Sequence, residues 1–280
     1  MAFLLYVAGV VFVGAVASPW VFRFVQPWLT EVPFRRVSNR VFLVIALAGL
    51  WPLGRALGVR TWAELGYARF AGWWRELLTG FGWGVISFAV VGTLLLTLQL
   101  RGVSTPEGLL RPAAFLLAGL VVAVIEETLF RGGLQGALQR SVNFPVAIVV
   151  TSAVYSAVHF LKPKGAGVAA ADVNWLSGFD YLGQVFARSS QTPGAAVGFV
   201  TLALAGAVLG LVFARTRTLY APIGIHAGWV LTLKTYAWLT DRVGPRTWWG
   251  GSSLVDNVLV WPVLLLMLWL AWTRFTPQAR

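Results

Sequence analysis

The stretch VVAVIEETLFRG, residues 121–132, places two adjacent glutamates inside one of the most apolar runs of the chain. Five apolar residues precede the pair Glu126 and Glu127, and Arg131 follows four residues after Glu127. A carboxylate in apolar surroundings is costly unless another group holds it. The pair therefore predicts a polar site buried among helices and not an ordinary lipid-facing helix.

The composition predicts an integral membrane protein. The 280 residues are 58% hydrophobic and only 11% charged, which is more apolar than a soluble domain of this size needs to be. Fifteen tryptophans suit the aromatic belts of a bilayer, and 30 glycines suit closely packed membrane helices. We therefore expect membrane lipids as partners and a bacterial or archaeal cell (inner) membrane as the location.

Charge and cysteine content exclude several other classes of protein. The net charge of +12 comes mostly from residues in short connections and near helix ends, where they meet anionic headgroups. No basic stretch interleaved with aromatic residues lies outside the apolar runs, so nucleic acid is not an expected partner. The chain has no cysteine, which excludes disulfides, thiolate metal sites and a cysteine nucleophile.

Apolar runs that approach the length of a membrane-spanning helix, about 17–25 residues, can be counted along the chain. Eight such runs lie at residues 3–24, 41–58, 79–100, 113–131, 144–161, 194–213, 221–240 and 258–275. Residues 1–5 contain no Lys or Arg, so we expect a retained first helix and not a cleaved signal peptide. The predicted fold is an all-α, polytopic transmembrane helix bundle with about eight spans.

Two polar connections contain apolar residues at helical spacing. Residues 60–80, RTWAELGYARFAGWWRELLTG, predict an interfacial helix that lies in the headgroups. Residues 162–193 predict a second amphipathic piece, either a helix packed on the bundle or a lid or substrate dock. Its apolar positions are Trp175, Leu176, Phe179, Leu182 and Phe186.

The expected organisation has three parts. Residues 1–112 form N-terminal transmembrane helices with an interfacial helix, residues 113–240 form the core that holds the site, and residues 241–280 form a loop and the last transmembrane helix.

Ionisable residues inside apolar runs are functional candidates by default. The candidates are Glu126, Glu127, Arg131, His159, His226 and Lys234. Adjacent residues of a helix point about 100° apart, so the two glutamates cannot do the same job. Glu127 and Arg131 lie on one face and can form an ion pair. Glu126 is then left to face a wet cavity as a general base. The alternative is a buried structural brace.

The two histidines are the only ones in the chain. His159 follows Tyr155 by four residues and so shares its helix face. His226 lies at the start of another run, and Gly228 thins the next turn so that a neighbouring helix can approach closely. One Glu with two His could hold a divalent metal, or Glu could activate water directly while a His stabilises an oxyanion. Serine proteolysis is disfavoured, because no glycine-flanked nucleophile turn appears.

Three motifs resemble those of the CPBP family, the CAAX-protease and bacteriocin-processing (Abi) intramembrane proteases. EETLFR at 126–131 resembles the family's EExxxR motif, and YSAVH at 155–159 resembles its second motif. The stretch GAVLGLVFARTRTLYAPIGIHAGW at 206–229 resembles the glycine-rich helix, basic turn and third-motif histidine. The resemblance covers roughly residues 113–240.

The resemblance implies a role for each matching residue. Glu126 resembles the water-activating glutamate, and Glu127 with Arg131 resembles its supporting pair. His159 resembles the histidine close to the water, and His226 resembles the one that binds the oxyanion. The family usually has Asn four residues after that last histidine, where this chain has Val230. We expect no cofactor and no metal ligand, with a metal-dependent protease using the same residues as an alternative.

The resulting functional hypothesis is an intramembrane endopeptidase that cuts a hydrophobic or lipidated peptide or protein by glutamate-activated water. A non-catalytic scaffold or immunity factor of the same fold is the alternative that Val230 keeps open. A proton-coupled transporter is disfavoured, because no repeated halves are found.

Overall fold

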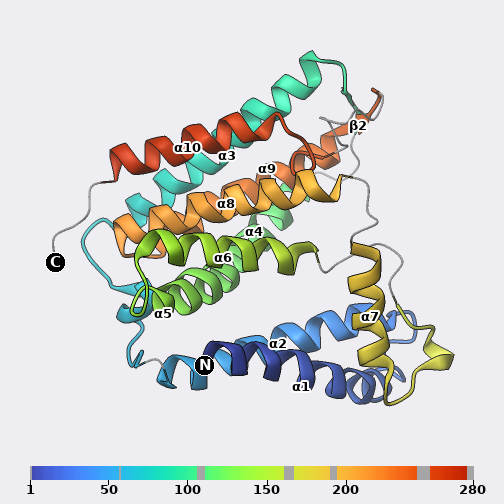
Figure 1. The fold of residues 1–280 in the computed structure, drawn as a ribbon. Coiled ribbons are helices and arrows are strands. Elements are labelled where there is room, and N and C mark those ends of the chain that lie inside the picture. Colours follow the sequence, from blue (N-terminus) through green and yellow to red (C-terminus); the bar gives the residue numbers. More distant parts are fainter. Residues whose placement is uncertain are drawn as a thin grey trace. The chain divides into compact units, whose positions relative to one another are not determined.

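The computed structural model describes residues 2–56, 58–105, 111–160, 167–189, 194–244 and 253–275, which form helices and one small sheet (Figure 1). The helical elements are α1 (Ala2–Val25), α2 (Phe34–Ala56), η1 (Ala63–Tyr67), α3 (Trp73–Thr97), α4 (Arg111–Glu127), η2 (Thr128–Gln135), α5 (Gly136–Leu138), α6 (Phe144–Phe160), η3 (Ala170–Asp172), α7 (Ser177–Ser189), α8 (Ala195–Thr216), α9 (Tyr220–Leu239) and α10 (Val260–Arg274). The predicted all-α membrane class is confirmed.

Each of the eight predicted apolar runs coincides with a helix. Five helical segments are long and apolar enough to cross a membrane: Leu5–Val25, Phe34–Ala56, Trp73–Thr97, Arg111–Leu138 and Ala195–Thr216. Two apolar helices, α6 and α10, are shorter. Helix α9 has 20 residues but contains His226 and Lys234, which lower its apolar character. The count of eight spans stays a prediction.

The predicted interfacial helix over 60–80 is not one continuous helix. Only the short π-helical turn η1 forms in its first half, and its second half supplies the first turns of α3. Gly66 and Gly72 divide the two parts, with φ of 101° and 95°. These left-handed conformations are open to glycine and interrupt a right-handed helix. The second predicted amphipathic piece forms α7; residues 162–166 and 190–193 lie outside the described residues.

The helices divide into two units. The first contains residues 1–60 and 158–195, and the second contains residues 61–157 and 196–280. The three-part division predicted from the sequence was based on motifs, whereas these two units are defined by packing. The three-part division therefore stays a prediction.

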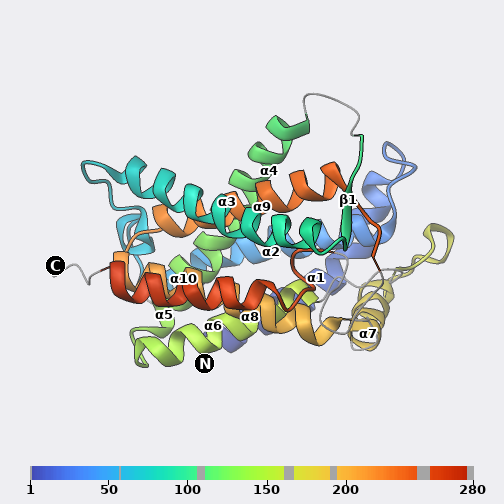
Figure 2. The same ribbon diagram turned by 90° about the horizontal axis from the view of Figure 1, so that it is seen from above.

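The first unit is built on the hairpin of α1 and α2, which lie side by side (Figure 1; Figure 2). Close approach is possible at Gly14, which contacts the ring of Phe42, and at Gly49, which contacts the ring of Tyr6. The Tyr6 hydroxyl donates a hydrogen bond to the carbonyl of Ala46 (2.8 Å). Helix α7 covers one end of the hairpin, where aromatic residues form a small core.

The second unit is organised around the pair α3 and α9, which make the most extensive helix–helix contact among the described residues (Figure 2). Glycines four apart on each helix allow it. A Cβ at Gly84 would lie 2.2 Å from the Ile225 carbonyl oxygen, and one at Gly224 would lie 2.1 Å from that of Leu77. Gly228 likewise faces the Phe81 carbonyl, so the close approach expected at Gly228 is confirmed. Small residues four apart are the usual means by which membrane helices approach.

The one sheet in the described residues joins the ends of these two helices. Strand β1 (Arg101–Val103) follows α3, and β2 (Thr240–Arg242) follows α9. They pair antiparallel, with Arg101 opposite Arg242 and Val103 opposite Thr240. The Arg101 side chain also donates to the Thr240 hydroxyl (2.7 Å), which strengthens the connection. Helix α9 is thus held along its length and at its end, and it carries His226 on a rigid support.

We predict that Gly84→Ala destabilises the protein, because the added methyl group meets the backbone carbonyl of Ile225, which cannot move aside. Overpacking of this kind costs about 1–3 kcal/mol. Gly82→Ala on the same helix is the matched control, since a Cβ there meets nothing within 4 Å. Thermal unfolding in detergent measures both; a Gly84 variant as stable as the Gly82 variant would contradict close α3–α9 packing.

Candidate active site

Glu127 lies at the centre of a buried network that joins three helical segments. Its Oε1 accepts hydrogen bonds from Arg131 Nη1 (3.1 Å) and from His226 Nδ1 (2.8 Å). The side chains of Glu127 and Arg131 are fully buried, and that of His226 is 6% exposed. The expected Glu127–Arg131 ion pair is present. The bond to His226 on α9 was not expected from the sequence.

The hydrogen bonds of Glu127 fix the orientation of His226. A carboxylate paired with a guanidinium has only acceptors to offer, so Nδ1 of His226 carries the proton of the shared hydrogen bond. The other ring nitrogen, Nε2, therefore has a lone pair in the neutral imidazole and a second N–H in the imidazolium. By binding Nδ1, Glu127 leaves Nε2 as the ring nitrogen that is available for chemistry.

Glu126 is on the other side of the same imidazole. Its Oε2 lies 3.8 Å from His226 Nε2, and its side chain is 19% exposed, whereas Glu127 is fully buried. The two adjacent carboxylates therefore have different surroundings, as the helix geometry predicts. One is bound into the ion pair, and the other lies beside the nitrogen that Glu127 leaves available.

Arg131 has further contacts that the sequence did not reveal. Its Nη2 donates to the carbonyl of Gly206 on α8 (3.2 Å), and its guanidinium lies 4.7 Å from the ring centre of Tyr155 on α6. The Tyr155 ring also meets the His226 ring edge to face at 6.4 Å. Groups from four helical segments thus surround the Arg131 guanidinium. Its contacts with them compensate for its removal from water.

Gln135 repeats this arrangement one turn further along. It is fully buried, and its Nε2 donates to the carbonyl of Gly210 (2.8 Å). A Cβ at Gly210 would lie 2.7 Å from the Gln135 side-chain oxygen, so glycine makes room for the contact. The spacing of four residues from Glu127 to Arg131 and again to Gln135 is a signal in the sequence that could have revealed this polar stripe.

The motif continues into the π-helical segment η2, which starts directly after Glu127. Such segments are rare and occur frequently at functional sites. The short turn η1 packs against it: Gly132 lies close to the Leu65 carbonyl, and Tyr67 contacts Thr128 (2.5 Å between oxygens). These contacts fix the helix immediately beside the two glutamates.

The direction of the hydrogen bond between Tyr67 and Thr128 can be inferred. The Thr128 hydroxyl has one hydrogen and donates it to the Val124 carbonyl (2.5 Å), so Tyr67 is the donor to Thr128. Burial raises the pKa of the Tyr67 hydroxyl above its ordinary value of 10.0, and the bond to Thr128 opposes this rise. The phenol is therefore protonated at neutral pH and can donate.

His159 is the penultimate residue of α6, and its side chain is half-buried. It belongs to the first unit, whereas Glu126 and His226 belong to the second. The convergence of His159 with the other site residues stays a prediction.

Val230 lies one turn after His226, on the side of α9 that faces Gly119 of α4. Besides the backbone, two nearby side chains could donate in place of the Asn of the family motif, and both are engaged elsewhere. Trp229 donates its indole N–H to the Ser87 hydroxyl (2.9 Å), and Thr232 donates to the carbonyl of Gly228 (2.9 Å). Neither supplies a second oxyanion donor in this arrangement.

Lys234, the remaining candidate, is exposed and lies near Phe115 of α4, with Nζ 5.9 Å from the ring centre. It is part of neither the Glu127 network nor the Glu126–His226 pair. Within the described residues, no group of three or more His, Asp or Glu side chains has the arrangement of a metal site.

The fold and the site define an integral membrane protein with a buried Glu–Arg–His network. Residues 108–232 match the family described as Type II CAAX prenyl endopeptidase Rce1-like. This segment contains all three motifs, so the resemblance predicted from them is confirmed, and the match supports a hydrolase of the protease class. No match was found among curated proteins or among solved structures.

We predict that Glu127→Gln lowers the thermal stability of the protein more than Glu126→Gln does. The first change leaves the fully buried Arg131 without its anion, which costs about 3–5 kcal/mol. The Glu126 side chain is 19% exposed, so solvent reduces the cost of its replacement. Thermal unfolding of both variants in the same detergent measures the difference, and equal melting temperatures would show that the Glu127 network does not hold the helices together.

Proposed function

We propose that this protein is an intramembrane endopeptidase that hydrolyses a peptide bond of a membrane-associated, hydrophobic or lipidated substrate. Glu126 is the general base that activates water, and His226 binds the oxyanion. The observation that carries the proposal is the 3.8 Å separation of Glu126 Oε2 and His226 Nε2, with the imidazole oriented from behind by Glu127.

The spacing suits a shared water. Two polar atoms 3.8 Å apart can both lie within about 2.8 Å of one water oxygen. Glu126 takes a proton from this water while the oxygen attacks the carbonyl carbon of the substrate. The carbonyl electrons move to its oxygen, which becomes the oxyanion. When the C–N bond breaks, Glu126 returns the proton to the leaving amine, so the enzyme ends in its starting state.

Stabilisation of the oxyanion requires a proton on Nε2. Because Nδ1 already donates to Glu127, His226 is then an imidazolium. His159 has the role of orienting the water, which rests on the resemblance of YSAVH to the second motif of the family.

The alternative is a non-catalytic scaffold or immunity factor of the same fold. It is supported by Val230, since Trp229 and Thr232 donate their hydrogens elsewhere. Loss of one oxyanion donor costs roughly 2.7–4 kcal/mol of barrier in a well-studied hydrolase. A protease that relies on His226 alone would therefore be slow but not inactive.

We predict that Glu126→Gln abolishes cleavage. General acid–base catalysis contributes about 10²–10⁴-fold to a rate, and the amide cannot accept the proton. The purified protein in detergent is incubated with a farnesylated CAAX peptide and with hydrophobic peptides that carry no lipid, and products are identified by mass spectrometry. Glu31→Gln, at an exposed position of the α1–α2 connection, is the matched control.

Cleavage by the wild type and the Glu31 variant, but not by the Glu126 variant, supports the proposed mechanism. Cleavage that persists in Glu126→Gln would contradict the role of Glu126. A parallel series with a strong chelator tests the metal-dependent alternative, in which the same residues would serve as ligands. The comparison of lipidated with unmodified peptides identifies the substrate class. We place this activity in a bacterial or archaeal inner membrane.

A further inference from the structure

Helix α7 has three distinct faces. Residues of a helix are offset by about 100°, which places Tyr181 and Val185 on one face, and both are buried against the α1–α2 hairpin. A second face is apolar; it consists of Phe179 and Phe186, which are exposed, and Leu182, which is half-buried, with exposed Trp175 in the preceding turn. A third face is polar and consists of Asp180, Gln184 and Arg188. The apolar and polar faces lie on opposite sides of the helix.

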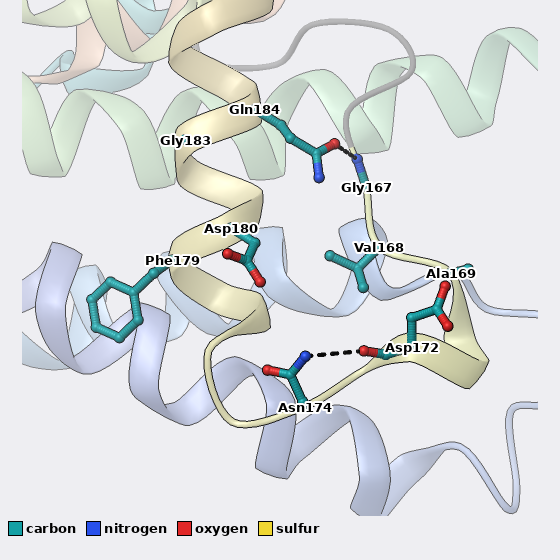
Figure 3. A pocket seen from close by; sticks show the side chains of 9 residues that line it. All are labelled: Gly167, Val168, Ala169, Asp172, Asn174, Phe179, Asp180, Gly183 and Gln184. Atoms are coloured by element: carbon teal, nitrogen blue, oxygen red, sulfur yellow. Dashed lines mark hydrogen bonds between the residues drawn. The ribbon is translucent and has the colours of Figure 1, made fainter.

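The exposed apolar face is large for a helix that already packs on a hairpin. Trp175 is 68% exposed and Phe186 is 61% exposed. Figure 3 shows Phe179 on one side of α7 and Asp180 with Gln184 on the other. Contiguous exposed aromatic residues mark an interaction surface.

Helix α7 runs across the α1–α2 hairpin in Figure 1, and Figure 2 shows it nearly end-on. The length and composition of α1 and α2 allow them to cross a bilayer. In that case the axis of α7 is roughly parallel to the membrane surface. The helix is held there firmly, because Gly178 contacts the backbone of Ala15, where a Cβ would lie 1.9 Å from the carbonyl oxygen.

On α2, the level of α7 coincides with a change in polarity. Its Tyr181 hydroxyl donates to Asn39 Oδ1 of α2 (2.9 Å). The first turns of α2 contain Arg35, Arg36 and Arg40, and the apolar run begins directly after them. Such a step from basic to apolar residues is typical of the headgroup boundary.

The apolar side of α7 faces the apolar surface of α1, and its polar side faces an open pocket. On the apolar side, the ring of Phe179 lies 6.0 Å from that of Phe12, which is 62% exposed on the apolar part of α1. On the polar side, Gln184 accepts a hydrogen bond from the Gly167 amide (3.1 Å) beside an open pocket of about 700 Å³ that Asp172 and Asp180 also line (Figure 3). The apolar side thus continues the lipid-facing surface of α1.

We propose that α7 is an interfacial helix that lies flat in the lipid surface, with Trp175, Phe179, Leu182 and Phe186 inserted toward the acyl chains. Asp180, Gln184 and Arg188 face water. The occupant is lipid and not a protein, because the stripe is continuous with the exposed side of a spanning helix. Aromatic and aliphatic side chains opposite a polar face are the composition of helices that insert at this depth. The proposal does not depend on catalysis.

The absence of cysteine allows a direct test with single-cysteine variants of the full chain. Phe186→Cys and Gln184→Cys are labelled with a polarity-sensitive bimane probe and reconstituted into phosphatidylcholine liposomes. Phe12→Cys on α1 is the reference for acyl-chain depth, and Trp175→Cys is a second position on the apolar side. Quenching is measured with doxyl-labelled lipids and with aqueous iodide.

The expected result is a blue-shifted emission at positions 186 and 175, with strong quenching by shallow doxyl lipids and little by iodide. Position 184 shows the reverse. Equal quenching by iodide at 186 and 184 would overturn the proposal, because α7 would then stand clear of the bilayer. Protection of position 186 from both quenchers would overturn it too, because protein would then cover the stripe.

Discussion

The sharing of one buried carboxylate by a guanidinium and an imidazole is the interaction on which the rest of the site depends. Glu127 holds Arg131 on its own helical segment and His226 on α9 through the same oxygen atom. A buried charge without a partner is costly, so Arg131 requires Glu127, and His226 depends on the same carboxylate for its orientation. The same contact that stabilises the packing of α9 on the motif helix also orients the imidazole toward Glu126.

Close helix packing makes this network possible. The glycines of α3 and α9 let the two backbones touch, and those of α8 expose carbonyls to Arg131 and Gln135. In lipid, the hydrophobic effect does not drive the association of helices. Close contact between backbones and hydrogen bonds to carbonyls therefore hold the bundle together. Positions that look like simple small residues in the sequence therefore determine where the catalytic candidates are.

The network also explains how two neighbouring glutamates can differ in role. Glu127 is fully buried and bound into the network, whereas the Glu126 side chain is partly exposed and its Oε2 lies beside Nε2 of His226. The proposed hydrolysis requires this division, because a general base must exchange its proton whereas a supporting anion must not move. Helix α7, in the other unit, is proposed to lie flat in the lipid surface.

The sequence by itself determined the membrane class, the positions of the eight apolar helices and the Glu127–Arg131 pair, because apolar run length and the spacing of four residues are local properties of a helix. It failed at 60–80, where Gly66 and Gly72 adopt left-handed conformations that helical periodicity does not register. Only the tertiary structure decided that His226 binds Glu127 and that α8 offers carbonyls to Arg131 and Gln135. These contacts join residues about 75 to 99 positions apart, so they depend on how helices pack and not on the order of residues within any one of them.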